Sequence, residues 1–220
     1  MTDDIDTMKE RAGRHAASYV RDGMRVGLGT GSTVHWTILA LGQRRPDILC
    51  AATSDRTHDL ATSLGLELTT PDEIGRLDIA IDGADEVDPA FNLTKGGGGA
   101  HTREKIVAAM ADQFVVVVDE HKLVPRLGPF GTPVELLRFA PRVAMQSIRK
   151  LGASSVALRA EPSDNGNLLA DAHFGEIEVP EQLAAQLAAV PGLVDHGLFP
   201  ATMVERVVVG AADGVRELVR

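Results

Sequence analysis

The spacing of apolar residues divides the chain into segments of helical and of strand character. Residues 5–20 place apolar side chains three and four positions apart, with Asp3 and Asp4 in the first turn and Gly23 beyond the end, which predicts an amphipathic helix. Short apolar runs of strand length then follow at 24–28, 48–52, 77–81 and 114–118. Such runs are typical of strands that are buried on both faces of a parallel sheet.

Helical patterns lie between these strands, at 33–44, 57–64 and 102–112, and a minor strand is predicted near 66–68. The resulting order is β-α-β-α-β-α-β. This order predicts an α/β fold with a Rossmann-like parallel sheet and helices on both of its faces.

A second, smaller module follows a stretch rich in Pro and Gly at 121–133. Its pattern predicts an α+β arrangement, with strands at 134–139, 154–158 and 168–174, helices at 142–151 and 180–189, and a turn at 164–167. The chain then ends with a Val-rich strand at 206–209 and a short helix from Asp213.

The last strand can return to the first sheet, which would make the smaller module an insertion. We therefore expect residues 1–132 and 205–220 to form the catalytic α/β domain. Residues 133–204 would form the smaller α+β domain, which serves as a lid or as an oligomer interface.

Composition excludes several classes of function. Lys and Arg number 22 against 31 Asp and Glu, a net charge of −9 that repels nucleic acid. No apolar run approaches the roughly 20 residues that a membrane helix needs, so no membrane partner is expected. The acidic start resembles neither a signal nor a transit peptide, and Cys50 is the single cysteine. We expect a cytoplasmic protein without an intrachain disulfide.

The first motif that bears on chemistry is GLGTGST at 27–33, between an apolar run and a helix. Its amides and hydroxyls suit a phosphate group. It matches neither the dinucleotide fingerprint nor a Walker A loop, which disfavours nucleotide binding. A tight turn with Ser32 or Thr33 as the N-cap is the alternative. The segment TSDRT at 53–57 repeats the arrangement more weakly.

The segment DGADE at 82–86 places three carboxylates at the end of a buried strand. Carboxylates there can exchange protons with sugar hydroxyls, and close like charges raise the pKa of one of them. An Asp-Gly turn with a solvated acidic rim is the alternative. The spacing does not fit an EF-hand calcium loop.

Four consecutive glycines follow Lys95, and Glu104 stands in the first turn of the next helix. Because glycine runs cost conformational entropy, the run indicates backbone that approaches a ligand closely. A flexible linker is the alternative for the glycines, and a helix-dipole carboxylate for Glu104. The histidines form no zinc-binding pair, and no G-x-S-x-G elbow is present, so neither a metal site nor acyl transfer is predicted.

Taken in order, GLGTGST, TSDRT, DGADE, KGGGGAHTREK and VDEHK resemble ribose-5-phosphate isomerases of the A type. The match continues through GTPVEL, SDNGN and HGLF to the C-terminal DGV, so it covers nearly the whole chain. That family interconverts ribose 5-phosphate and ribulose 5-phosphate in the pentose phosphate pathway. The resemblance implies a homodimer or homotetramer that needs no metal or organic cofactor and takes a small sugar phosphate as its substrate.

The resemblance also implies a role for individual residues. Glu104 corresponds to the general base that moves a proton between C2 and C1 through a cis-enediolate. Lys95 stabilises the enediolate oxygens, and Asp82 and Asp85 bind hydroxyls and assist ring opening. The substrate-binding positions are Gly83, Ala84, Gly96, Gly97 and Gly98 at the sugar, Thr30, Gly31, Ser32 and Thr33 at the phosphate, Lys122 as a binding cation, and Lys9 as a further phosphate ligand. His101 departs from many relatives and would change the pH profile if it lay near Glu104.

Two other classes compete with an isomerase. A sugar-phosphate sensor would need a DNA-binding module, for which the sequence leaves no room before the first strand and carries the wrong charge. A sugar-phosphate deaminase would depend on a catalytic histidine, and a CoA transferase on a nucleophilic glutamate. Ammonia release and CoA exchange are the assays that separate these enzymes from an isomerase.

Overall fold

The computed structural model describes residues 5–220, so Asp3 and Asp4 lie outside the described residues. The chain divides into two compact units. Unit 1 comprises the chain up to Gly83, with Arg103–Lys122 and Thr202–Arg220, and unit 2 comprises Ala84–Thr102 and Leu123–Ala201.

Unit 1 is built on a seven-stranded sheet in the order β14-β13-β7-β4-β1-β2-β3. All neighbouring pairs are parallel except β13 with β14. The strands are β1 (Arg25–Leu28), β2 (Leu49–Ala52), β3 (Glu67–Leu68), β4 (Leu77–Gly83), β7 (Ala111–Asp119), β13 (Arg206–Ala211) and β14 (Gly214–Val219). The apolar runs of the sequence thus became the parallel strands of an α/β sheet, which confirms the predicted fold class.

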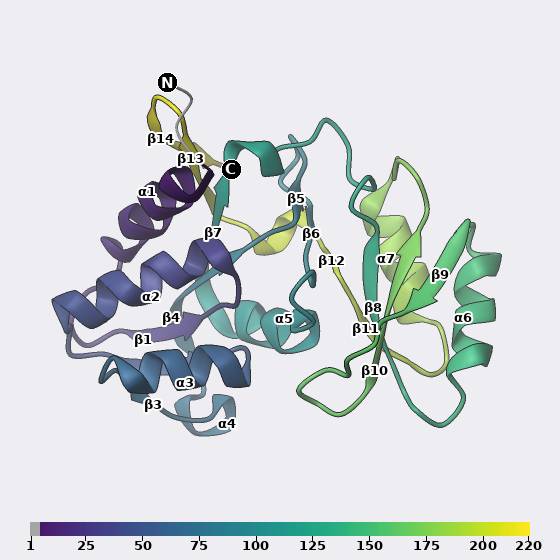
Figure 1. Cartoon of the computed structure of the whole chain (residues 1–220), viewed down its shortest axis with the longest axis horizontal. Helices are drawn as coiled ribbons and strands as arrows, with labels where there is room; N and C mark the ends of the chain where they lie inside the picture. Colours follow the sequence, from purple (N-terminus) through teal and green to yellow (C-terminus); the bar gives the residue numbers. More distant parts are fainter. Residues whose placement is uncertain (1–4) are drawn as a thin grey trace. The chain divides into compact units, whose positions relative to one another are not determined.

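Helices cover both faces of this sheet. On one face α1 (Ile5–Ala17) and α2 (Ser32–Arg44) lie side by side, and with α3 (Asp55–Ser63) they share one apolar core with the strands (Figure 1). On the other face α5 (His101–Met110) packs so closely that a Cβ on Gly27 would meet the Val107 side chain at 2.5 Å. Three short helical elements follow or lie between the strands of this sheet: the single turn α4 (Pro71–Ile74) and the 3-10 turns η1 (Glu120–Lys122) and η2 (Ala201–Met203).

The prediction of a helix from Asp213 is wrong, because the chain forms strand β14 there. Ala211 pairs with Gly214, so Ala212 and Asp213 form a two-residue hairpin loop, and Gly214 has a φ of 141°. The reason is tertiary. Pairing with β14 gives the otherwise unpaired outer edge of β13 a full set of hydrogen-bond partners, which outweighs the helical start signal of a single Asp.

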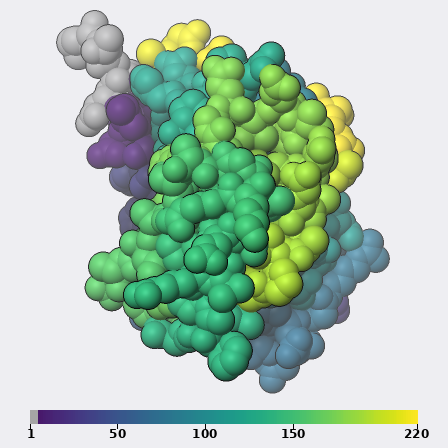
Figure 2. All heavy atoms as spheres, turned by 90° about the vertical axis from the view of Figure 1, so that its right-hand side faces the viewer, coloured from purple at the N-terminus to yellow at the C-terminus, as the bar shows by residue number. Residues whose placement is uncertain are grey.

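Unit 2 contains a four-stranded antiparallel sheet in the order β11-β8-β10-β9. Its strands are β8 (Thr132–Leu136), β9 (Ser155–Leu158), β10 (Leu168–His173) and β11 (Leu193–His196). One face packs against α6 (Pro141–Lys150) and α7 (Pro180–Ala188), where Val134, Ile148 and Leu187 belong to the same apolar core. Figure 2 shows α6 and its neighbouring segments at the surface of unit 2. Val143 of α6 is 60% exposed.

A small three-stranded sheet, also in unit 2, consists of β5 (Glu86–Val87), β6 (Leu93–Thr94) and β12 (Leu198–Phe199) in the order β12-β6-β5. The sequence did not predict it, because two-residue strands are too short to show a period. This sheet explains why the observed division differs from the expected one. The segments 84–102 and 123–132 belong with the smaller unit, rather than with the large sheet.

Candidate active site

In unit 1, the loop between β1 and α2 carries a buried cluster of hydroxyl groups. The Thr30 hydroxyl lies 2.8 Å from that of Thr53, 2.7 Å from that of Ser54 and 3.0 Å from that of Thr57. Thr57 also donates a hydrogen bond from its hydroxyl to the carbonyl of Gly29 at 2.9 Å. The two sequence motifs GLGTGST and TSDRT therefore form one structure, in which the second motif supports the first.

Asp82, at the end of β4, is 3% exposed and is held by backbone amides. Its Oδ1 accepts hydrogen bonds from the amide of Thr30 at 3.0 Å and from the amide of Gly83 at 2.7 Å. Gly29 makes room for it, since a Cβ at that position would lie 2.1 Å from Asp82 Cγ. The structure thus brings together Asp82, Gly83 and the glycine-rich loop.

The N-terminus of α2 has no side-chain cap. Gly31 occupies the N-cap position with a φ of 145°, and Ser32 is the first helical residue. The expected alternative, with Ser32 or Thr33 as the N-cap, is therefore wrong. Gly31 and Ser32 are exposed and Thr33 is buried. An exposed helix start without a side-chain cap leaves backbone amides and the positive end of the helix dipole available to an anion.

Glu104 lies in the first turn of α5 and is 4% exposed. The preceding residue, Arg103, forms a 2.7 Å ion pair with Asp55 at the start of α3. That pair ties the beginning of α5 to the segment that supports the hydroxyl cluster. A buried carboxylate in a first helical turn faces little water, which is the environment a proton-abstracting group requires.

The two lysines expected at the substrate lie on different elements of unit 1. Lys122 is half-buried in η1, directly after β7. Lys9 is half-buried on α1, with its Nζ 3.8 Å from an Asp6 carboxylate oxygen. It stands one turn before Gly13, where a Cβ would meet the Thr33 carbonyl oxygen at 2.6 Å. Lys9 therefore shares the α1 face that packs against the start of α2.

In unit 2, Asp85 is half-buried and holds the glycine run. Its Oδ2 accepts a 2.7 Å hydrogen bond from the amide of Gly97, and its own amide donates to the Thr94 carbonyl at 2.8 Å. Ala84, which precedes it, is also half-buried. The structure thus brings Asp85 together with one of the glycines that the resemblance assigned to the sugar.

The glycine run forms a tight turn rather than a flexible linker. Gly96 and Gly99 adopt φ values of 102° and 83°, and the Gly99 amide donates to the Gly96 carbonyl at 3.0 Å. Gly97 and Gly98 are exposed. At the start of the turn, Lys95 is 2% exposed, its amide donates to the Gly197 carbonyl, and its Nζ lies 5.5 Å from the centre of the Phe199 ring.

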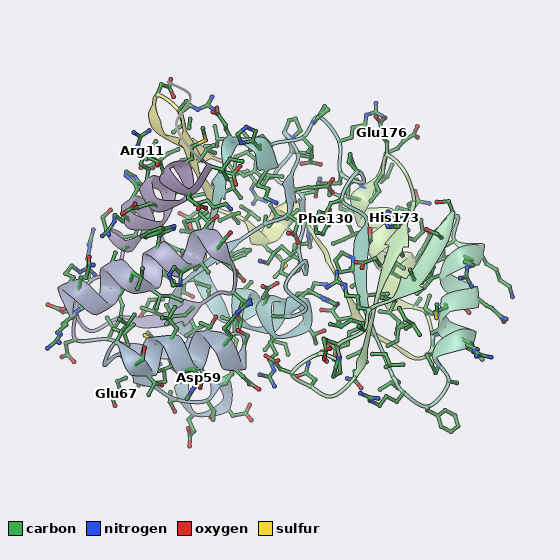
Figure 3. All side chains as sticks on the ribbon, viewed as in Figure 1. Arg11, Asp59, Glu67, Phe130, His173 and Glu176 are labelled. Carbon is green, nitrogen blue, oxygen red and sulfur yellow. The ribbon has the colours of Figure 1, made fainter. Side chains whose placement is uncertain are left out.

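Glu86 does not belong to the expected cluster of three carboxylates. It is 2% exposed and accepts hydrogen bonds from the amides of Gly128 at 2.9 Å and Phe130 at 2.7 Å, and from the Thr94 hydroxyl at 2.8 Å. Phe130 is among the residues labelled in Figure 3. Glu86 therefore fixes the 128–130 segment inside unit 2 and has a structural role.

His101 is fully buried at the start of α5, where a Cβ on Gly96 would lie 2.8 Å from its Nδ1. Its Nε2 lies 3.3 Å from the Asp195 carbonyl oxygen. From the sequence, His101 was expected to change the pH profile if it lay near Glu104. Within unit 2 it fills the space that the absent side chain of Gly96 leaves.

Unit 1 supplies the buried carboxylates of Asp82 and Glu104 and a helix start that suits an anion, and unit 2 supplies the buried cation of Lys95 and exposed glycine amides. Each of these groups is of a kind that serves proton transfer on a small anionic substrate. Within residues 5–220, no three His, Cys, Asp or Glu side chains are grouped to hold a metal ion. Within the same residues, no helix has the length and apolar character needed to cross a membrane.

Comparisons with known proteins agree with one another. The model of the family described as "Ribose 5-phosphate isomerase A (phosphoriboisomerase A)" matches residues 49–214. The Thermomicrobium roseum protein named "Ribose-5-phosphate isomerase A" is 47% identical over 223 residues, which cover 96% of this chain and 93% of that protein.

Solved structures give the same result. The ribose 5 phosphate isomerase A of Neisseria gonorrhoeae is 32% identical and has a TM-score of 0.96, over 100% of this chain and 98% of that one. A D-ribose-5-phosphate isomerase solved in complex with phospho-erythronic acid is 35% identical, with a TM-score of 0.95 over 99% of this chain and 100% of that one.

Proposed function

Because this chain belongs to the ribose 5-phosphate isomerase A family, and is thereby an aldose-ketose isomerase, we propose that it interconverts D-ribose 5-phosphate and D-ribulose 5-phosphate. The reaction moves one proton between C2 and C1 through a cis-enediolate, without a metal ion. The observation that carries this proposal is the buried carboxylate of Glu104 in the first turn of α5. The phospho-erythronic acid in the related structure is a phosphorylated sugar acid and supports a sugar phosphate as the substrate.

The phosphate binds at the start of α2. There the amides and hydroxyls of the Thr30–Thr33 segment surround an uncapped helix N-terminus, whose partial positive charge favours an anion. Lys122 and Lys9 add positive charge, which offsets the negative charge of the phosphate. The buried hydroxyl network behind Thr30 keeps the loop in one conformation, so binding does not have to order it.

Ring opening precedes proton transfer. It requires a proton to leave the C1 hydroxyl and another to reach the ring oxygen. Asp82 and Asp85 are the carboxylates that exchange these protons. Asp82 is held by two amides and Asp85 by one, so each carboxylate has a defined orientation.

Glu104 then removes the proton from C2 of the open-chain aldose, and the electron pair forms the C1–C2 double bond of the enediolate. Lys95 stabilises the negative charge that develops on the two oxygens, and the exposed amides of the glycine turn hold the sugar. Glu104 returns the proton to C1, while the O2 hydroxyl proton passes to O1, and the ketose results. Burial of Glu104 keeps water from exchanging with the transferred proton.

The test is the interconversion of the two sugar phosphates by purified protein in EDTA. We expect activity to survive chelation, and Glu104→Gln to lower kcat by about a hundredfold or more, as the loss of a general base should. Glu67→Gln, the same change on an exposed residue of β3, is the matched control and should retain full activity. A fully active Glu104→Gln variant would place the base elsewhere. Binding of ribose 5-phosphate without turnover by the wild type would favour a sensor.

We propose the pentose phosphate pathway and the cytoplasm as the setting of this reaction, and a homodimer or homotetramer as the assembly. The resemblance of the motifs supports the pathway and the assembly. Light scattering coupled to size-exclusion chromatography will measure the mass in solution. A monomer that remains at high concentration would contradict the proposed assembly.

A further inference from the structure

The glycine turn lies on one face of the four-stranded sheet of unit 2. In the pairing register, Leu169 and Asp171 of β10 share a face with Ala157 of β9, and Arg159 continues that face beyond the end of β9. This is the face opposite the apolar core of α6 and α7. A Cβ on Gly99 would lie 2.8 Å from the Leu169 side chain, so the turn contacts this face directly.

Arg159 joins the sheet to the turn. Its Nε and Nη2 form a two-point ion pair with Asp171, at 2.9 Å and 2.5 Å. Its Nη1 donates to the carbonyl of Gly96 at 2.8 Å and to that of Gly97 at 3.2 Å. Because the guanidinium is planar, the two-point pair with Asp171 fixes the plane in which Nη1 approaches the two carbonyls.

These bonds decide where the amides of the turn point. In a trans peptide the carbonyl and the following amide point in opposite directions. With the Gly96 carbonyl on Arg159, the Gly97 amide is directed away from Arg159, and it donates to Asp85. With the Gly97 carbonyl on the same guanidinium, the amide of Gly98 is also directed away from Arg159. A cation at the carbonyl end further polarises each peptide and strengthens its amide as a donor.

We propose that Arg159, held in place by Asp171, is a positioning residue that orients the amides of Gly97 and Gly98 and, through Gly97, the carboxylate of Asp85. The inference rests on the proposed function of the turn. Arg159 acts through the backbone and through Asp85. Neither Arg159 nor Asp171 stood out in the sequence, because an isolated Arg after a strand and an isolated Asp within one carry no local signal.

The kinetic test compares Arg159→Met, Arg159→Lys and Asp171→Asn with the wild type. Since the phosphate loop in unit 1 is unchanged, we expect Arg159→Met to lower kcat about tenfold to a hundredfold while KM changes less than about threefold. Arg159→Lys keeps a cationic donor and should recover part of that loss. Asp171→Asn keeps Arg159 but removes its charged partner, and should lower kcat by a smaller factor.

The matched control is Arg149→Met. Arg149 also donates to a backbone carbonyl in unit 2, that of Val156 at 3.1 Å, on the α6 side of the sheet. The Arg149→Met variant should lose thermal stability to a similar extent as Arg159→Met but keep the kcat of the wild type. Because the wild type and this control report the reaction itself, inactivity of both would refute the proposed function and leave the positioning role to be decided by exchange.

Amide hydrogen exchange measures the orientation without reference to activity. In Arg159→Met the amide of Gly97 should exchange at least about tenfold faster than in the wild type, because Asp85 no longer receives it in a fixed direction. Asp171→Asn offers the same measurement if Arg159→Met does not fold. The proposal is overturned if Gly97 exchange is unchanged in the variants, or if an active wild type and Arg159→Met share the same kcat.

Discussion

Replacing Glu135 with glutamine tests a carboxylate of unit 2 that accepts hydrogen bonds from several side chains. Glu135 is fully buried in β8. It accepts from the side chains of Ser163 at 2.8 Å, Asn167 at 2.8 Å and Asn165 at 3.1 Å, and from the Thr102 hydroxyl. Four donors thus converge on one carboxylate.

The expected loss in the free energy of unfolding follows from the charge of the acceptor. A hydrogen bond to an ionised group contributes about 1.5 to 3 kcal/mol, against about 1 kcal/mol for a neutral pair. Glutamine keeps one carbonyl oxygen, which is a weaker hydrogen-bond acceptor than a carboxylate oxygen. Its NH2 group is a donor and faces other donors at the position of the second carboxylate oxygen. Offset by the relief of a buried charge, the expected loss is about 3 kcal/mol. For a slope of about 2 to 3 kcal/mol per molar urea, the midpoint falls by about 1 M.

The pH dependence of the stability difference supplies a second, independent test. Burial acts to raise the pKa of Glu135, but hydrogen bonds from Thr102, Asn167, Ser163 and Asn165 outweigh it and hold the pKa below its usual value. A carboxyl with a lowered folded pKa contributes its full stability above the unfolded pKa of about 4.3, and the contribution disappears as pH falls through the folded pKa. The difference between wild type and Glu135→Gln should therefore be full at pH 7 and shrink below about pH 4.

The assay is urea unfolding followed by far-ultraviolet circular dichroism at pH 7 and at pH 3. Trp36, the single tryptophan, lies on α2 of unit 1, so its fluorescence reports the other unit in the same titration. Glu176→Gln, an exposed change in unit 2 (Figure 3), is the control. Equal midpoints for the two variants at pH 7, or a difference that stays constant down to pH 3, would refute the reasoning.

Two further predictions follow from close packing. Gly29→Ala places a Cβ 2.1 Å from Asp82 Cγ, so the carboxylate must move, and we expect kcat to fall at least about tenfold in the isomerase assay. An unchanged kcat would show that the position of Asp82 is not critical. Burial raises the pKa of the Cys50 thiol to about 12, so a thiol reagent at pH 8 should label the native protein at least about a hundredfold more slowly than the urea-unfolded chain. Equal rates would contradict that burial.

The large sheet was predictable because parallel strands are buried on both faces and appear as unbroken apolar runs. Val115, Val117 and Val208 all lie in one core with less than a tenth of their surface exposed. The edge strand β14 has no such pattern, since Arg216 and Glu217 are exposed and only its partner strand specifies it. Edge strands are specified by tertiary pairing, which a single-sequence pattern does not contain.

In the candidate site, too, some residues were predictable from the sequence and others depend on tertiary contacts. Glu104, Asp82 and the glycine turn stand out because their residue types are unusual at those positions. Glu86 was grouped with Asp85, but Asp85 precedes β5 and Glu86 begins it, and the two carboxylates bind different segments. Arg159 contacts glycines more than sixty residues earlier in the chain, a pairing that only the register of β9 and β10 creates.

The contact between the two ends of unit 1 governs the order in which the protein can fold. A Cβ on Gly210 of β13 would lie 1.9 Å from the Met8 carbonyl oxygen of α1, and Arg11 of α1 (Figure 3) donates to the carbonyls of Ala211 and Ala212. On the ribosome, α1 emerges long before β13. Until β13 arrives, β7 pairs only with β4 and presents an open, Val-rich edge. A chain stalled before Arg206 therefore exposes a strand ready to pair with other chains, and only the arrival of β13 closes that edge.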